Sequence, residues 1–247
     1  MRSKNFFPLL VALVLAFGFA PTTEASKMNT KTTLDARQQS IVTISAFTAS
    51  GEIDRLNPAL HQGLDAGLTV NEVKEILVQM YAYAGFPRSL GGIWAFMDVM
   101  DKRKAQGIQD EVGDEASPLP EDMDKDEYGA KVRAKLAGLD EVPTTKAAYQ
   151  KFCPIIDTFL KEHLFADIFA RDILTHQERE LATIACLANL GGAEGPLKFH
   201  FGAAMNTGLS EGQMYDFIKV LEAKIGKKEA EQAKEVLQAV LSERKQQ

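Results

Sequence analysis

One stretch of sequence decides the fold: residues 174–210, which read LTHQERELATIACLANLGGAEGPLKFHFGAAMNTGLS. Near its start, Thr175 and Glu178 stand three positions apart, as in a capping box that begins a helix. An apolar helical pattern follows and is ended by two adjacent glycines, and a second helical pattern then carries His200. Ser210 begins another helix. The stretch therefore predicts three successive helices joined by short turns.

A weaker copy of this stretch lies earlier in the chain, at residues 34–69. Asp35 and Gln38 have the capping-box spacing of Thr175, and Thr69 repeats the start signal at Ser210. Helix starts of one design in two pairs with similar internal spacing indicate an internal duplication. No segment shows the sustained alternation of a strand. The predicted fold class is therefore all-α, built from a duplicated helical unit.

Composition and charge limit the class of protein. The chain has 247 residues, of which 45% are hydrophobic and 25% charged, as in an ordinary globular protein with a sizeable core. Its formal net charge of −6 argues against nucleic acid or an anionic membrane as the main partner. We expect a small-molecule substrate instead.

The first 25 residues have the pattern of a secretory signal peptide. Arg2 and Lys4 precede an apolar run from Phe6 to Ala20, and small residues around Ala25 offer a cleavage site. The run is shorter than the roughly 20 residues of a comfortable membrane span. We expect a periplasmic or secreted chain with no membrane association after cleavage near Ala25. The alternative is an uncleaved N-terminal anchor.

The rest of the chain is expected to form three parts. Residues 26–104 make the first helical unit and residues 146–247 the second. Residues 105–145 are acidic, rich in Gly and Pro, and form a connection with one short helix at 127–136. The two cysteines, Cys153 and Cys186, lie in apolar helical contexts, so we expect both to be buried and unpaired. An oxidising compartment would permit a disulfide between them.

Two residues of the second copy can carry chemistry. Glu180 lies one turn inside a helix and borders its apolar face, where a carboxylate needs a partner. His200 titrates near neutral pH and can both donate and accept a proton. Each residue also has a purely structural interpretation. Glu180 would pair with Arg179 or His176 at the surface, and His200 would be a hydrogen-bonded core histidine.

The corresponding positions of the first copy are Ser40 and Ala59, so neither group is repeated there. The four histidines and two cysteines show none of the close pair spacings of zinc sites. The sequence also contains no phosphate loop and no dinucleotide fingerprint. We therefore expect no metal and no cofactor.

Several pieces of the sequence resemble one known family. They are Arg179-Glu180-Leu181, Leu190-Gly191-Gly192, His200 with the segment MNTGL after it, and the first-copy segments from Gly67 to Thr69 and from Tyr83 to Pro87. Together they are similar to the carboxymuconolactone decarboxylase-like family, which includes the AhpD-type alkylhydroperoxidases. The resemblance covers both copies. It implies a helical bundle that assembles into a ring, with two-unit chains forming homotrimers.

The resemblance implies two chemistries. AhpD-type members reduce peroxides with a Cys-x-x-Cys pair, a glutamate and a histidine. Glu180 and His200 fall on the last two, but Ala193 and Pro196 stand at the thiol positions. Because the thiolate is the nucleophile of that reaction, the sequence does not favour alkylhydroperoxidase activity.

The decarboxylase branch needs no thiol and no cofactor. It implies His200 and Glu180 as catalytic residues and Arg88 as the group that holds a substrate carboxylate. Phe86, Pro87 and Tyr83 are candidates for the substrate-binding wall, so the two copies would build one site together. Because a secretory signal is unusual for aromatic catabolism, the substrate could be another small lactone or carbonyl compound. A non-catalytic ring that binds a ligand or partner is the remaining alternative.

Overall fold

The computed structural model describes residues 31–246, so the predicted signal peptide lies outside the described residues. In the described part every regular element is a helix and no strand is present, which confirms the all-α class. No described helix has the length and apolarity that a membrane crossing would need.

The first unit consists of helices α1 (Ala36–Ser50), α2 (Ile53–Asp65) and α3 (Val70–Ala105). Both predicted capping boxes are formed, at Asp35 and at Thr69. Helix α3 folds back on itself at Gly85, where φ is 83° and ψ is 160°. Its two halves pack side by side, and the Ser89 hydroxyl donates to the Leu77 carbonyl across them at 2.7 Å. A residue with a side chain would be strained at this φ, so glycine is required.

The second unit repeats this order with helices α7 (His176–Leu190), α8 (Glu194–Asn206), α9 (Glu211–Lys224) and α10 (Lys227–Arg244). Capping boxes at Thr175 and Ser210 begin α7 and α9. Helices α9 and α10 pack together as a hairpin and meet at Gly226, which corresponds to Gly85 of the first unit. Both units thus have the same order of elements, two helices followed by a helical hairpin, as the duplication predicts.

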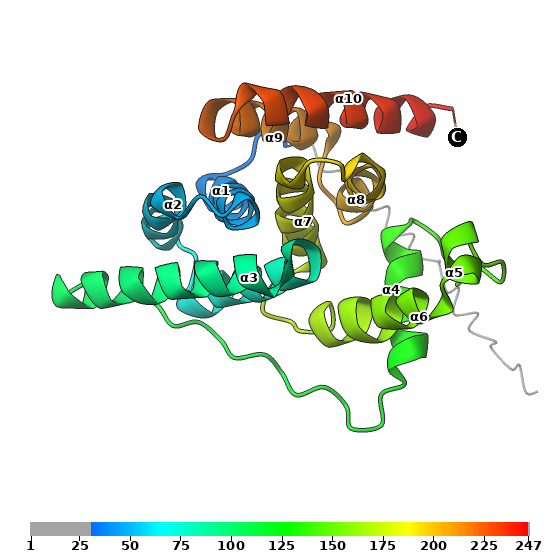
Figure 1. The fold of residues 1–247 in the computed structure, drawn as a ribbon, viewed down its shortest axis with the longest axis horizontal. Coiled ribbons are helices and arrows are strands. Elements are labelled where there is room, and N and C mark those ends of the chain that lie inside the picture. Colours follow the sequence, from blue (N-terminus) through cyan, green and yellow to red (C-terminus); the bar gives the residue numbers. More distant parts are fainter. Residues whose placement is uncertain (1–30, 247) are drawn as a thin grey trace, which may run out of the picture.

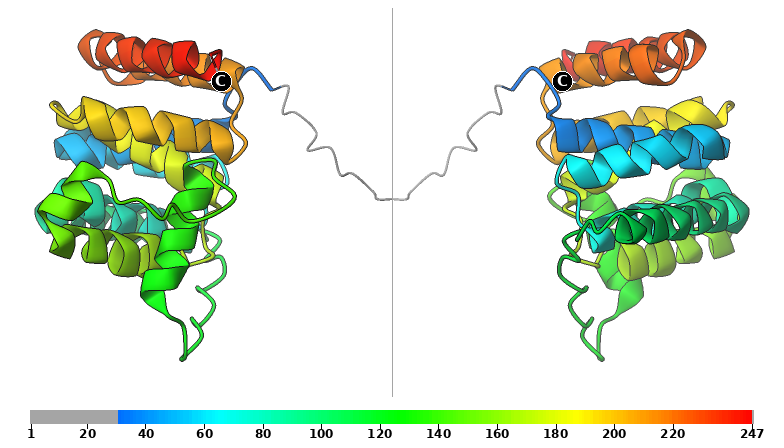
Figure 2. Two further views of the ribbon diagram at one scale, coloured as in Figure 1. Left: turned by 90° about the vertical axis from the view of Figure 1, so that its right-hand side faces the viewer. Right: turned by 90° about the vertical axis from the view of Figure 1, so that its left-hand side faces the viewer.

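The helices form layers (Figures 1 and 2). Helices α1, α2, α7 and α8 lie in the middle, α3 covers one face of them, and the α9–α10 hairpin covers the other. Helices α1 and α7 pack directly against each other at the centre. One apolar core joins the units, and its fully buried members include Ile41, Leu77, Ile184, Phe201 and Leu221.

Part of the connection between the units is hydrogen-bonded to the start of α3. The carbonyls of Glu111 and Val112 accept hydrogen bonds from the backbone N–H groups of Val70 and Asn71, both at 2.9 Å. Those two groups lie in the first turn of α3 and have no partner within the helix. Helix α4 (Lys125–Leu136) follows and confirms the predicted short helix.

A small helical group then leads into the second unit. It consists of α5 (Ala148–Phe152), α6 (Pro154–Thr158) and the π-helical segment η1 (Phe159–Ile168). The group packs on α4, beside the end of α8.

The cysteine prediction is half wrong. Cys186 is buried in α7, as expected, but Cys153 is exposed. Cys153 stands at the junction of α5 and α6, where its extended backbone breaks the helix and keeps the side chain at the surface. Both thiols are free, so the described structure contains no disulfide between them.

Candidate active site

The turn between α7 and α8 brings Glu180 and His200 together. Gly191 and Gly192 both have positive φ, 66° and 68°, and reverse the chain so that α8 runs back along α7. The Nδ1 atom of His200 lies 2.7 Å from Oε2 of Glu180. The two side chains are 7% and 0% exposed. The pair is therefore a buried histidine–carboxylate contact between two packed helices.

The contact sets the protonation of the histidine ring. When the Glu180 carboxylate is ionised it can only accept hydrogen bonds, and Nδ1 then carries the proton. The other ring nitrogen, Nε2, forms no hydrogen bond with a described residue. A neutral His200 thus has its lone pair on Nε2, and a protonated one can donate from Nε2 while Glu180 compensates the positive charge.

Two aromatic rings hold the imidazole edge-on. Phe199 lies 5.1 Å away with an interplanar angle of 86°, and Tyr83 lies 5.5 Å away with an angle of 82°. Phe199 precedes His200 on α8, whereas Tyr83 comes from α3 of the first unit. The site is therefore built from both units, and Tyr83 is the predicted wall residue that contacts the histidine.

The second carboxylate oxygen of Glu180, Oε1, and the Tyr83 hydroxyl are both buried polar atoms that lack a well-formed hydrogen bond in the described structure. The Tyr83 hydroxyl nevertheless lies within reach of Thr183. Burial raises the pKa of the Tyr83 hydroxyl well above its ordinary range, and the negative charge of Glu180 raises it further. Tyr83 therefore keeps its proton at all ordinary pH values.

Arg179, the neighbour of Glu180, does not pair with it. Its fully buried guanidinium donates to Glu75 at 2.7 Å and to the Gln79 side-chain oxygen at 2.8 Å. The Gln79 amide in turn donates to the Arg179 carbonyl at 2.8 Å. His176 bonds to the Phe169 carbonyl. The predicted alternative partners of Glu180 are thus both engaged elsewhere.

The sequence analysis did not predict the Glu75–Gln79–Arg179 group, which joins α7 to α3 and so positions Glu180. The sequence nevertheless contains a pattern that indicates such a group. Glu75 and Gln79 stand four positions apart, on the face of α3 that also carries Ile76 and Met80 into the core. Two polar residues at that spacing on a buried face require buried partners.

The remaining predicted wall residues lie at the Gly85 fold of α3 and are exposed. Phe86 stacks on Tyr81, with ring centroids 4.6 Å apart. The Arg88 guanidinium covers Gly51, where any Cβ would overlap it, and forms no ion pair with a described residue. Phe86, Pro87 and Arg88 form no hydrogen bond or ring contact with Glu180 or His200 in the described chain. Their binding role stays a prediction.

The cysteines are poorly placed for peroxide chemistry. Cys186 is fully buried, and burial raises the pKa of its thiol to about 12. The two predicted thiol positions bracket the start of α8, with Ala193 at the cap and Pro196 in the first turn. No thiolate is therefore available beside Glu180 and His200 from the described cysteines.

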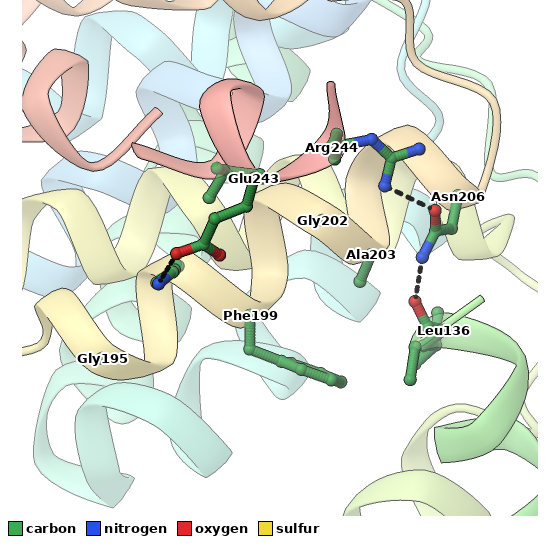
Figure 3. Close-up of a pocket in the computed structure, with 11 residues that line it drawn as sticks. Leu136, Gly195, Phe199, Gly202, Ala203, Asn206, Glu243 and Arg244 are labelled. Carbon is green, nitrogen blue, oxygen red and sulfur yellow. Dashed lines mark hydrogen bonds and ion pairs between the residues drawn. The ribbon is translucent and has the colours of Figure 1, made fainter. Parts of the chain in front are cut away.

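Two cavities flank α8 near the pair. One, of about 450 Å³, is shown in Figure 3 and is lined by Phe199, Gly202 and Asn206 of α8 together with Glu243 and Arg244 of α10. The other, of about 570 Å³, lies between α4 and the α5–α6 group and also reaches Phe199. Neither is lined by Glu180 or His200. Among the described residues no three His, Cys, Asp or Glu side chains cluster as metal ligands.

Comparison with known proteins gives the family. No curated protein matches the chain. The model of the carboxymuconolactone decarboxylase family matches twice, at residues 18–96 and 156–239. The first match includes α1, α2 and the first part of α3, and the second includes α7, α8 and α9. With both units matched over more than half of its length, the chain belongs to the carboxymuconolactone decarboxylase family.

Proposed function

We propose that this protein is a cofactor-independent enzyme. It would decarboxylate, or carry out related acid/base chemistry on, a small carboxylated lactone or carbonyl compound. His200 and Glu180 would be its catalytic residues. The observation that supports this proposal is the 2.7 Å contact between them, which is buried and leaves Nε2 without a hydrogen-bond partner among residues 31–246.

The chemistry needs what this pair offers. When the bond to the leaving carboxylate breaks, its electron pair stays on the substrate and must be stabilised and then protonated. A protonated His200 can donate from Nε2 to the substrate, and Glu180 holds the ring in orientation throughout. No step in this scheme requires a metal, a thiol or a bound cofactor.

Arg88 is proposed to bind the substrate carboxylate, with Phe86, Pro87 and Tyr83 forming the wall. An arginine holds a carboxylate through two parallel hydrogen bonds. In the described chain the Arg88 guanidinium has no acidic partner, so it is available to an anionic substrate.

The test is CO2 release from 4-carboxymuconolactone by the chain beginning at Ser26. His200→Ala and Glu180→Gln are expected to abolish release. The matched control is His163→Ala, because His163 also contacts a carboxylate, Asp167 at 2.9 Å, but is exposed and forms no contact with Glu180 or His200 that the structure records. Full activity in His200→Ala would refute the proposed site. No release by the unaltered chain would exclude this lactone and favour another carbonyl substrate or a binding role.

Alkylhydroperoxidase activity is the alternative that the family allows, but the described cysteines do not favour it. Peroxide consumption by the same protein, with Cys186→Ala as control, would show whether this alternative holds. A non-catalytic binding ring predicts inactivity in both assays.

We further propose that the chain forms a homo-oligomer, a trimer as the resemblance implies. Large apolar side chains line one exposed face of the second half of α3, four, four and three positions apart: Phe86, Leu90, Trp94 and Met97. Exposed apolar stripes of this size mark interaction surfaces. Trp94→Glu should lower the mass measured by light scattering, whereas Val112→Glu, at an exposed apolar residue of the connection, should not.

Export to the periplasm or the medium is also proposed, from the charge and apolar pattern of residues 1–25. A C-terminally tagged chain should be recovered outside the cytoplasm, free of membrane, with its N-terminus near Ser26. An intact N-terminus in the membrane fraction would favour the uncleaved anchor.

A further inference from the structure

The unpartnered atoms at the centre of the site point to a role for Tyr83 that the family assignment does not give it. A buried polar group without a hydrogen bond is costly, and most such groups in folded proteins have a partner. Here one potential donor, the Tyr83 hydroxyl, and one acceptor, Glu180 Oε1, are both buried, and neither has a well-formed hydrogen bond to a described residue.

The two atoms belong to neighbouring groups. Tyr83 lies edge-on to His200, which holds the other oxygen of the same carboxylate. The Tyr83 hydroxyl lies close to two acceptors on α7: the carboxylate of Glu180 and, one turn later, the hydroxyl of Thr183, which is within hydrogen-bonding reach. The Thr183 hydroxyl donates to the Arg179 carbonyl at 2.8 Å and accepts from Gln79 at 2.9 Å, which leaves it one lone pair with which to compete for the Tyr83 proton. A carboxylate oxygen is the stronger acceptor of the two, because hydrogen bonds to charged groups are stronger than neutral ones. Glu180 Oε1 is the acceptor that lacks a donor.

We infer that Tyr83 donates its hydroxyl proton to Glu180 Oε1, so that one carboxylate oxygen is held by Tyr83 and the other by His200. Both side chains already contact the same imidazole, Tyr83 through its ring and Glu180 through Oε2. Tyr83 then acts as a positioning residue through Glu180, in place of the wall role given to it above. This inference rests on the proposed function and deepens it.

Two observations agree with this role. The raised pKa of Tyr83 keeps its hydroxyl protonated, so it remains a hydrogen-bond donor. The arrangement also explains how the first unit takes part in the chemistry without an acid/base residue of its own. It contributes the donor that fixes the carboxylate of the second unit.

The decisive experiment observes the His200 Nδ1 proton by NMR in ¹⁵N-histidine-labelled chain, in Tyr83→Phe and in the control Tyr81→Phe. Tyr81 is two residues away on α3, stacks on Phe86, and has the same hydroxyl to lose. Without the Tyr83 donor, Glu180 becomes a stronger acceptor, so the Nδ1 proton should shift further downfield in Tyr83→Phe alone. An unmoved resonance in a folded Tyr83→Phe protein would overturn the inference, whatever activity is found.

Two further measurements complete the test. If Tyr83→Phe fails to fold, a high-resolution crystal structure of the unaltered chain decides. A Tyr83–Glu180 oxygen distance of about 2.7 Å is expected, and a hydroxyl bonded to Thr183 instead would contradict the inference. Where CO2 release is measurable, Tyr83→Phe should lower kcat about tenfold with KM unchanged. A raised KM alone would return Tyr83 to the substrate-binding wall. Absence of release from every variant would count against the proposed substrate only.

Discussion

Arg179 and Glu75 form an ion pair of 2.7 Å that is buried at both ends and joins the two units. Arg179 lies in α7, one residue before the proposed catalytic glutamate, and Glu75 lies in α3. Glu75 is held a second time by Arg171, at 3.0 Å. The pair thus ties the helix that carries Glu180 to the hairpin that carries Tyr83, and its loss should affect both stability and site geometry.

Arg179→Ala is expected to lower the free energy of unfolding by about 3 kcal/mol, because it removes the buried partner of Glu75 and leaves that carboxylate only the more exposed Arg171. Replacing both members with apolar residues, as in Arg179→Met with Glu75→Leu, should cost less than the single change. Urea unfolding followed by circular dichroism measures both. The control is Lys102→Ala, whose exposed pair with Asp98 should contribute under about 1 kcal/mol. Equal losses for Arg179→Ala and this control would contradict the prediction.

Gly192→Ala is expected to destabilise the chain by about 1–2 kcal/mol. Gly192 has a φ of 68°, and nothing lies within 4 Å of an added Cβ, so the cost comes from the backbone alone. Gly202→Ala is the matched control, inside the following helix α8, with open space and no positive φ. It should be neutral or stabilising by up to about 1 kcal/mol, because alanine favours the helix. Unfolding midpoints of the two variants that shift equally would rule out a strained turn.

Alkaline pH should destabilise the protein through Cys186. Burial raises the pKa of this thiol from 9.0 to about 12, so the unfolded chain loses the proton at a pH where the folded chain keeps it. The free energy of unfolding should therefore be unaffected below about pH 9 and fall by about 1.4 kcal/mol per pH unit above it.

The measurement is the urea midpoint at pH 8.5 and at pH 10.5. Cys186→Ala should flatten the dependence, although Tyr83 retains a part of it above its own ordinary pKa of 10.0. The exposed Cys153→Ala should keep the full slope. If Cys186→Ala and the unaltered chain show the same slope, the thiol ionises in the folded state.

Arg37→Met should destabilise the chain at pH 7 more than at acid pH. Arg37 of α1 pairs with Glu72 and Glu178, the capping-box glutamates that begin α3 and α7. Burial alone would raise the pKa of Glu178, but its bonds to Arg37 and Thr175 outweigh burial and lower it. The stability from this pair is therefore complete above the ordinary value of 4.5 and is lost as the pH falls below it.

The expected loss in Arg37→Met is about 1–2 kcal/mol at pH 7, and it should shrink when unfolding is measured near pH 3. Lys131→Met removes an exposed pair with Glu127 within one helix and should change little at either pH. A loss for Arg37→Met that is the same at both pH values would show that packing of the arginine stem matters more than its charge.

Local signals in the sequence predicted the helices well. The boxes at Asp35, Thr69, Thr175 and Ser210 all form, because a capping box depends only on residues three positions apart. The reversal of α3 at Gly85 also has a local cause, because glycine can adopt the positive φ that the structure shows there. The prediction that Cys153 is buried was wrong. Its apolar neighbours indicated a helix interior, whereas the helix breaks at that residue.

The sequence by itself determined the all-α class, the duplication, the helix starts and Glu180 with His200 as the candidate pair. Only the tertiary structure decided which groups meet: Arg179 with Glu75 instead of Glu180, and Tyr83 of the first unit beside His200 of the second. Helix starts follow from short-range hydrogen bonds and side-chain periodicity, which depend only on residues close together in the sequence. Contacts between residues about a hundred positions apart depend on how whole helices pack, and no local pattern encodes that.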